Sequence, residues 1–313
     1  MTLLLSSDLD RQIRSNFSPT IQDLIDTYFS QTHLNDRLQE LPQQFTHPHP
    51  RKWARIEWQS INYNQIIGIE PNLFLAIIKG AIDTEAPIRD YTHTSRQYLD
   101  PIHPMMAKFV GGTVDEVGNL RSKGLWEIEE CRHAPALATI YRQLSGEKIK
   151  PTVKQVRSYQ PTSCPSNDLY RHGLHRIFTE YGATCLYLWL MGHSTGTLRQ
   201  VLGEMVEDEI NHLIKFWGFG IWLYPYAKGD RFIHGCRQLL PHQSSGNNLL
   251  TTYHRMMSVL HWDEWTFQHR WQIVLTFYLV MKRLLVWHHS LNSADLDLIF
   301  GSSPLGDRLT PSK

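Results

Sequence analysis

Two short segments constrain this chain more than any other feature. Glu130 and His133 lie three residues apart in the first, and Glu209 and His212 have the same spacing in the second. Both segments lie within stretches of helical periodicity. Residues three apart share one face of a helix, and a carboxylate and an imidazole on one face can bind the same pair of metal ions. Mixed oxygen and nitrogen ligands favour iron or manganese.

Apolar residues share the helix face of each pair and predict that both pairs point inward. The first face carries Trp126, Leu137 and Ile140, and the second carries Leu202, Met205 and Phe216. A buried carboxylate without a partner is costly. Two neighbouring ones therefore require a cation, or a proton on at least one of them.

A dinuclear carboxylate site in a helical bundle takes one further glutamate from each of two other helices. The helix predicted over residues 168–192 contains one glutamate, Glu180, on an apolar face. The helix predicted over residues 71–99 offers Glu85, with Asp83 as the competing candidate. The predicted metal ligands are Glu85, Glu130, His133, Glu180, Glu209 and His212.

Two further acidic residues, Asp208 and Glu129, each precede a predicted ligand. Metal-bound histidines usually donate their second N–H to a carboxylate. We expect each of these residues to orient the histidine of the opposite motif and so to take part in catalysis. The alternative is that both are capping or surface charges.

The rest of the chain is dominated by helical periodicity, with few strand-like alternations. We expect an all-α fold, a four-helix bundle with extra N- and C-terminal helices. Helices are predicted over residues 19–34, 71–99, 114–144, 168–192, 195–224, 248–260 and 263–289. A kink is expected at Pro87. The prolines of residues 41–50 predict a linker, whose His47-Pro48-His49-Pro50 run has a metal-binding tract as its alternative interpretation.

The expected domain organisation is one bundle over residues 54–225. An N-terminal helix and linker precede it at residues 1–53. C-terminal helices packed on the bundle follow at 226–290, and a polar tail, predicted to be flexible, follows at 291–313.

Composition excludes several classes of function. The 313 residues are 42% hydrophobic and 19% charged, which is enough to bury a core. A net charge of +1 does not indicate a nucleic-acid partner. The basic cluster of Arg51, Lys52 and Arg55 is interpreted as solvated surface, with a docking patch for an acidic partner as the alternative.

The most apolar stretch, residues 273–281, is less than half of the about 20 residues that a membrane span requires. The four cysteines include no Cys-x-x-Cys pair, which argues against a thiolate zinc site. We expect a cytoplasmic protein without a membrane span.

The motifs resemble those of the soluble acyl-acyl-carrier-protein desaturases, in the ferritin-like di-iron carboxylate superfamily. The family segment Trp-x-x-Glu-Glu-x-Arg-His is matched by Trp126, Glu129, Glu130, Arg132 and His133, with Leu144-Ser145-Gly146 following. Its Asp-Glu-x-x-His motif is matched by Asp208, Glu209 and His212. Phe178-Thr179-Glu180 and Thr84-Glu85-Ala86-Pro87 resemble its other two glutamate segments. The likeness covers roughly residues 58–217.

The resemblance implies a ferritin-like bundle whose two iron ions activate dioxygen. It also implies a ferredoxin-type electron donor and a carrier-bound acyl substrate. Trp58 resembles the family's surface tryptophan on an electron path through Asp208, although a core tryptophan is an equal interpretation. Manganese in place of iron, a free apolar substrate and a homodimer remain open.

Two departures put desaturation in doubt more than the metal centre. Ala183 stands where the family has a threonine, and Pro135 interrupts a predicted helix.

Three functions are consistent with the predicted site. The first is a dioxygen-dependent oxidase or desaturase acting on a fatty acyl or other apolar substrate. The second is an N-oxygenase or hydroxylase of a small natural-product intermediate, against which Met205 argues because such enzymes carry a histidine there. The third is a non-catalytic metal-binding protein.

Overall fold

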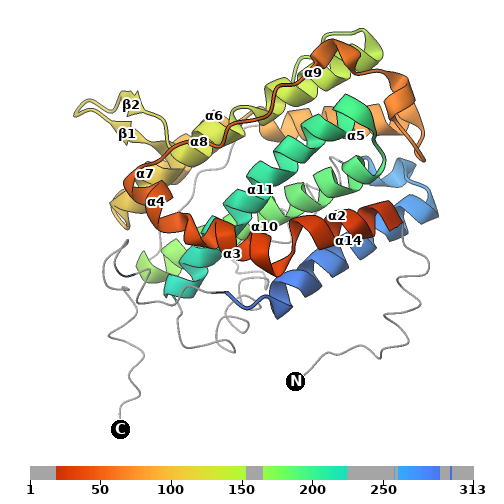
Figure 1. The fold of residues 1–313 in the computed structure, drawn as a ribbon. Coiled ribbons are helices and arrows are strands. Elements are labelled where there is room, and N and C mark those ends of the chain that lie inside the picture. Colours follow the sequence, from red (N-terminus) through yellow and green to blue (C-terminus); the bar gives the residue numbers. More distant parts are fainter. Residues whose placement is uncertain (1–18, 153–164, 224–256, 258–259, 290–296, 298–313) are drawn as a thin grey trace.

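The computed structural model describes residues 19–152, 165–223, 257, 260–289 and 297 (Figure 1). Within these residues the chain is helical apart from one small antiparallel hairpin and the connecting segments. The predicted all-α bundle is confirmed. Among the described residues, no helix combines the length and the hydropathy that a membrane span requires.

The described elements follow one another in chain order. The helices are α2 (Pro19–Tyr28), α3 (Gln31–Gln39), α4 (Leu41–Thr46), α5 (Pro71–Glu85), α6 (Ile88–Leu99), α7 (Pro104–Gly111), α8 (Leu125–Glu130), α9 (His133–Ser145), α10 (Pro165–Gly192), α11 (Gly196–Leu223) and α14 (Phe267–Val286). The strands are β1 (Thr113–Val114) and β2 (Leu120–Ser122), and the short 3-10 helices are η1 (Trp58–Ser60), η2 (Tyr63–Gln65) and η3 (Trp262–Glu264).

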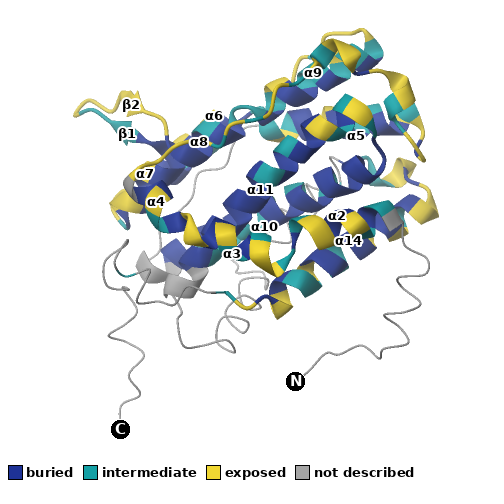
Figure 2. Cartoon of the chain, in the orientation of Figure 1, coloured by how far each residue is buried: buried dark blue, intermediate teal, exposed yellow. Residues whose placement is uncertain are grey.

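The centre of the bundle is formed by α5, α8 with α9, α10 and α11. The two longest helices, α10 and α11, form the most extensive pair, and α5 packs against α9. Ile78, Leu137, Leu188 and Leu202, one from each of α5, α9, α10 and α11, are fully buried. Full burial of one such side chain stabilises the fold by about 1.5–3 kcal/mol. In Figure 2 the buried faces of these helices are turned toward one another.

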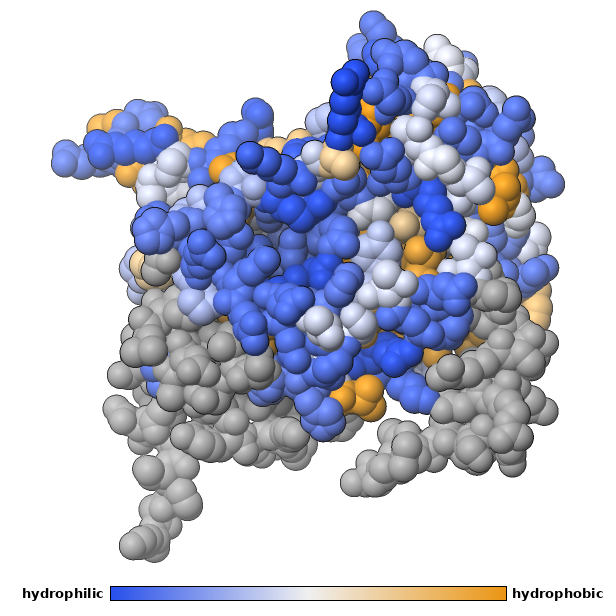
Figure 3. All heavy atoms as spheres, viewed as in Figure 1, coloured by the Kyte–Doolittle hydropathy of each residue, from blue (hydrophilic) through white to orange (hydrophobic). Residues whose placement is uncertain are grey.

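Further helices cover this centre. α2 packs on α10, α14 packs on both α10 and α2, and α3 packs on α11. The face shown in Figure 3 is mainly hydrophilic, with hydrophobic side chains scattered between polar ones. This pattern agrees with helices that bury one side and expose the other.

The N-terminal region differs from the prediction in two places. The helix expected over residues 19–34 ends at Tyr28, and α3 begins after Ser30, whose hydroxyl caps it by accepting from the N–H of His33. The linker expected over residues 41–50 begins with α4. Pro42 is compatible with that helix because a first-turn residue needs no N–H donor.

The helix predicted over residues 114–144 is wrong in its first part, where the β1–β2 hairpin lies. Asp115 organises the turn, since its carboxylate accepts from the N–H groups of Val117 and Asn119. Gly118 follows with φ of +87°, a left-handed conformation that favours glycine. These local contacts outweigh the helical periodicity.

Pro135 breaks the same predicted helix a second time, between α8 and α9. It lacks the N–H that would bond the carbonyl of Cys131, and its ring clashes with that carbonyl in a continuous helix. In the first turn of a new helix neither defect matters. α8 therefore ends at Glu130 and α9 begins at His133.

The kink expected at Pro87 is a complete break. Pro87 cannot donate to the carbonyl of Asp83, so α5 ends at Glu85 and α6 begins at Ile88. Glu85 is thereby the last residue of its helix. Nearly all of the helix predicted over residues 248–260 and of the tail at 291–313 lies outside the described residues.

Gly124 provides a test of the close approach between α7 and α8. A Cβ there would lie 2.5 Å from the carbonyl oxygen of Phe109 and 2.6 Å from the carbonyl carbon of Val110. Because these are backbone atoms, Gly124→Ala should lower the free energy of unfolding by about 1–3 kcal/mol. Urea unfolding followed by circular dichroism measures this change.

The matched control is Gly173→Ala within α10. A Cβ at Gly173 meets no described atom within 4 Å. Alanine has the higher helix propensity, so this variant should be unchanged or more stable by up to about 1 kcal/mol. Equal destabilisation by the two substitutions would contradict the packing described for Gly124.

Candidate metal centre

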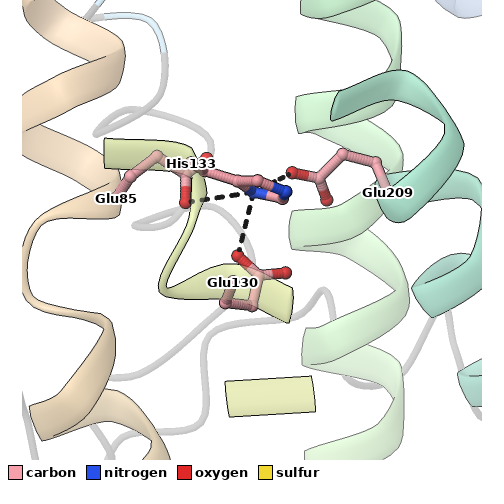
Figure 4. A group of neighbouring side chains, drawn as sticks. All are labelled: Glu85, Glu130, His133 and Glu209. Carbon is pink, nitrogen blue, oxygen red and sulfur yellow. Dashed lines mark ion pairs between the residues drawn. The ribbon is translucent and has the colours of Figure 1, made fainter. Parts of the chain in front are cut away.

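The helix breaks and the long helices bring all six predicted ligands to one place. Glu85 and Glu130 are the last residues of α5 and α8, and His133 is the first residue of α9. Glu180 comes from α10, and α11 supplies both Glu209 and His212. Figure 4 shows Glu85, Glu130 and Glu209 converging on His133 from three sides.

The six side chains form two overlapping groups. Each group offers four ligand atoms that lie within 4.8 Å of one another. One group contains Glu85 and His133, the other contains Glu180 and His212, and Glu130 and Glu209 belong to both. The two shared carboxylates thus lie within reach of both histidines and would serve both halves of a dinuclear site.

The Nδ1 atom of each histidine faces this cluster of carboxylates. His133 Nδ1 lies 3.1 Å from Glu209 Oε1, 3.3 Å from Glu130 Oε2 and 3.9 Å from Glu85 Oε2. His212 Nδ1 lies 2.8 Å from Glu130 Oε1 and 3.5 Å from Glu180 Oε2. All these side chains are buried except that of Glu85, which is partly exposed.

Orphaned polar atoms test whether the cluster fits a metal. Four buried atoms have no described partner in hydrogen-bonding geometry, although other polar atoms surround them: Glu130 Oε1, His133 Nδ1, Glu209 Oε1 and His212 Nδ1. The opposite ring nitrogen of each histidine contacts a carboxylate outside the cluster. Nε2 therefore carries a proton in each ring, so the neutral form of each histidine, which binds metals, directs its Nδ1 lone pair inward. Lone pairs that point into the cluster and accept no hydrogen bond are suited to binding metal cations.

Electrostatics point the same way. Burial, then repulsion from Glu130, raises the pKa of Glu85 to about 8 and the pKa of Glu209 well above its ordinary range. Burial opposes charge on His133 and His212, but nearby carboxylates outweigh it and raise both pKa values. Burial likewise opposes charge on Glu130, and the two imidazoles outweigh it and lower its pKa. Without metal, protons thus offset the charge of the cluster.

Asp208 and Glu129 lie outside the six ligands. Each contacts the histidine of the opposite motif, as expected from the sequence. Asp208 Oδ2 lies 3.3 Å from His133 Nε2, and Glu129 Oε2 lies 2.9 Å from His212 Nε2. Burial opposes charge on both carboxylates. Hydrogen bonds and charges from their partners outweigh it, so the pKa of Asp208 falls to about 2 and that of Glu129 is lowered.

Three residues to which the sequence assigned no role at the site complete the surroundings of Asp208. Arg51 Nε, Arg132 Nη2 and Trp53 Nε1 each donate to its carboxylate at 2.8 Å. Lys52 and Arg55 are exposed, as the surface interpretation of this cluster predicts, whereas the guanidinium of Arg51 is only partly exposed and forms ion pairs with both Asp208 and Glu204. Arg132 belongs to the recognised motif, whereas no local pattern marks Arg51 or Trp53, which precede Asp208 by more than 150 residues.

Tyr187 is a further neighbour that the sequence did not reveal. It is buried in α10, and its hydroxyl donates to Glu85 Oε1 at 2.6 Å. Spacing from Glu180 could have suggested it, since residues seven apart recur on one helix face. Asp83, the competing candidate for Glu85, lies outside the cluster and accepts from the N–H of Thr152 at 2.6 Å.

Trp58 lies apart from the hydrogen bonds of Asp208. It is half-buried in η1 and lines an open pocket of about 780 Å³. Trp53 lines the same pocket, and its ring stacks beside His133 with 6.3 Å between ring centres. The indole that bonds Asp208 is therefore that of Trp53, five residues before the tryptophan expected from the resemblance.

Comparisons of the chain with protein-family models, with curated proteins and with solved structures found no match. The family inferred from the motifs therefore stays a prediction. Support for the site comes from its geometry, a buried cluster of carboxylates and imidazoles that could hold metal ions.

The raised pKa of Glu85 predicts how the stability of the metal-free protein depends on pH. Glu85 has a folded pKa of about 8 against an ordinary value of 4.5, so the folded protein keeps a proton that the unfolded chain releases. Its contribution is complete below pH 4.5 and is lost as the pH rises toward 8. The raised pKa values of His133 and His212 act in the same direction above 6.5.

Unfolding of chelator-treated protein between pH 6.5 and 8 measures this effect, with the lower limit set by the ordinary pKa of histidine. Each proton lost in this range contributes a slope of at most about 1.4 kcal/mol per pH unit. Glu85→Gln should flatten the slope. Stability that rises with pH in the metal-free protein would contradict the charge balance described above.

Proposed function

We propose that the chain is a dinuclear iron oxidoreductase that uses dioxygen to oxidise an apolar substrate, most closely by fatty acyl desaturation or a related oxidation. The observation that carries this proposal is the convergence of four glutamates and two histidines from α5, α8, α9, α10 and α11 on one buried cluster. Ferritin-like di-iron proteins use this ligand set.

The choice of metal rests on the donor atoms. The cluster offers carboxylate oxygens and imidazole nitrogens and contains no thiolate. Such donors suit iron and manganese, whereas zinc and iron–sulfur sites commonly use cysteine. When bound, two iron ions would supply the redox chemistry that couples dioxygen reduction to oxidation of a C–H bond. Desaturation consumes two hydrogens of the substrate and two external electrons with two protons, and reduces dioxygen to two waters.

The chain's own residues prepare the site for that reaction. Glu130 and Glu209 belong to both ligand groups and would help to hold both ions, and Asp208 and Glu129 fix the two imidazoles. The helices around the cluster exclude water, which strengthens electrostatic interactions there.

Thr184 supplies a candidate proton donor. It lies one helical turn after Glu180, is fully buried, and its hydroxyl has no described hydrogen-bond partner. A helical threonine commonly bonds the carbonyl four residues earlier, so an unengaged hydroxyl beside the cluster remains available to another acceptor. The desaturase-like threonine is displaced by one position, with Ala183 preceding it.

The path for external electrons begins at Trp53. Its N–H bonds Asp208, which bonds His133, so a continuous hydrogen-bonded path joins the open pocket to a metal ligand. Arg132 lies over the Trp53 ring at 5.2 Å and also donates to Asp208. A one-electron donor of the ferredoxin type would deliver electrons at this pocket.

Metal analysis and oxygen consumption test the proposed function. Purified protein loaded anaerobically with Fe²⁺ should hold about two ions per chain, as expected for this ligand set, and should consume dioxygen when a reductant is supplied. Glu130→Ala removes a ligand shared by both groups, so it should lose most of the metal and the activity. Two bound ions without reductant-dependent oxygen consumption would leave a non-catalytic metal protein and refute the enzyme.

The electron path predicts different effects for two tryptophans. Trp53→Phe keeps an aromatic ring but removes the donor to Asp208. A hydrogen bond to a charged group contributes about 1.5–3 kcal/mol, and a barrier raised by about 1.4 kcal/mol slows a step about tenfold. Loss of this bond from the electron path should therefore lower reductant-dependent oxygen consumption by about tenfold or more. Iron content, measured in parallel, should be retained.

Trp58→Phe is the matched control in the same pocket and should leave the rate unchanged. The opposite result, a slow Trp58→Phe variant and a normal Trp53→Phe variant, would assign the path to Trp58 instead.

A further inference from the structure

The segment of residues 51–54, here called the strap, crosses the outer side of the metal centre. It belongs to the non-helical chain between α4 and η1, which runs along α8 and α9 in Figure 1. It contributes no metal ligand. Its contacts nevertheless reach both motifs, because it lies against the outer carboxylates of α8 and α11.

Arg51 makes the central contacts of the strap. Its backbone N–H donates to Glu129 Oε1 at 2.7 Å, and its guanidinium donates to Asp208 Oδ1 at 2.8 Å. The same guanidinium donates to Glu204 Oε2 at 2.6 Å and to the main-chain carbonyl of Glu204. One residue thus bonds the two carboxylates that orient the two different histidines.

Neighbouring groups hold the strap in the same position. Ala54 donates its N–H to Glu204 Oε1 at 3.0 Å, and Trp53 donates to Asp208. Arg132 donates from α8–α9 to the carbonyl of Arg51. Every one of these hydrogen bonds joins the strap to a residue of the α8–α9 segment or of α11, so within the described part of the chain they hold the strap across the two motifs.

Charge explains why the guanidinium is needed. Asp208 and Glu129 are buried carboxylates, and an unpaired buried charge costs several kcal/mol. Lys215 is buried near Glu129 and attracts it, and Arg132 pairs with Asp208. Arg51 adds a second cation at Asp208 and, through the docked backbone, a donor at Glu129. Loss of the Arg51 guanidinium should therefore free both the Asp208 carboxylate and, as the strap leaves, the Glu129 carboxylate.

We propose that Arg51 is a positioning residue that couples docking of the strap to loading of both metal sites. This inference rests on the proposed metal centre and assigns it a means of control. A docked strap fixes Asp208 and Glu129, and these fix the inward orientation of His133 and His212. Because such coupling is reciprocal, metal bound by the histidines favours the docked strap.

Metal binding by variants tests the coupling, with Co²⁺ as the probe because its visible spectrum reports ligand geometry. Arg51→Gln should weaken both Co²⁺ sites, each by about 10- to 100-fold, the usual cost of losing a group that orients a metal ligand. Lys52→Gln is the matched control, since Lys52 is the adjacent, exposed cation of the strap. It should bind Co²⁺ like the wild type.

Hydrogen–deuterium exchange of the wild-type protein supplies a test that needs no variant. The N–H groups of Arg51 and Ala54 are bonded in the docked strap. A peptide covering the strap should exchange more slowly when Co²⁺ is bound than after chelation. In Arg51→Gln this metal-dependent protection should disappear, which a purely structural role of Arg51 would not cause.

The outcomes separate this inference from the proposed function. A wild-type protein that binds no Co²⁺ would refute the metal centre itself. A wild-type protein with two Co²⁺ sites, whose strap exchanges at the same rate with and without metal, would overturn only the coupling. So would an Arg51→Gln variant in which one site or neither is weakened.

Discussion

Four carboxylates and two imidazoles share an interior from which water is largely excluded, and the rest of the structure depends on how their charge is balanced. Burial and mutual repulsion raise the pKa values of Glu85 and Glu209, while two histidines hold Glu130 in its charged form. Protons can maintain this balance, and two divalent cations would maintain it with fewer unsatisfied lone pairs. A core built this way loses packing energy that an apolar core would gain. That cost is a reason to regard the cluster as functional.

The balance extends beyond the ligands. Asp208 and Glu129 add two buried negative charges, and they are compensated by cations from different parts of the chain, Arg51, Arg132 and Lys215. The compensation at Asp208 is the richer of the two, with two guanidinium groups and an indole N–H. The two histidines therefore sit in unequal surroundings, and the one beside Asp208 lies at the end of the path to the surface. Under the proposed function, electrons would enter the site on the side of Asp208.

Prolines also shape the inner cluster. Pro87 and Pro135 break helices that would otherwise be continuous, and the breaks place Glu85, Glu130 and His133 at helix ends. A carboxylate at the C-terminal end of a helix faces the negative end of the helix dipole. Cations bound there would relieve this repulsion. The breaks thus add to the demand for positive charge at the centre of the bundle.

The sequence alone determined the helical class and the positions of the six clustered side chains, because helical spacing is local and an apolar face shows which side points inward. It also indicated the pairing of Asp208 and Glu129 with the opposite histidines. Helix ends were less predictable, as the β1–β2 hairpin and α4 show, since turn hydrogen bonds compete with periodicity. Only the tertiary structure decided that Arg51 and Trp53 belong to the site. Their contacts with Asp208 join residues more than 150 positions apart. Because no local sequence pattern links residues at such a distance, only folding of the whole chain brings these side chains together.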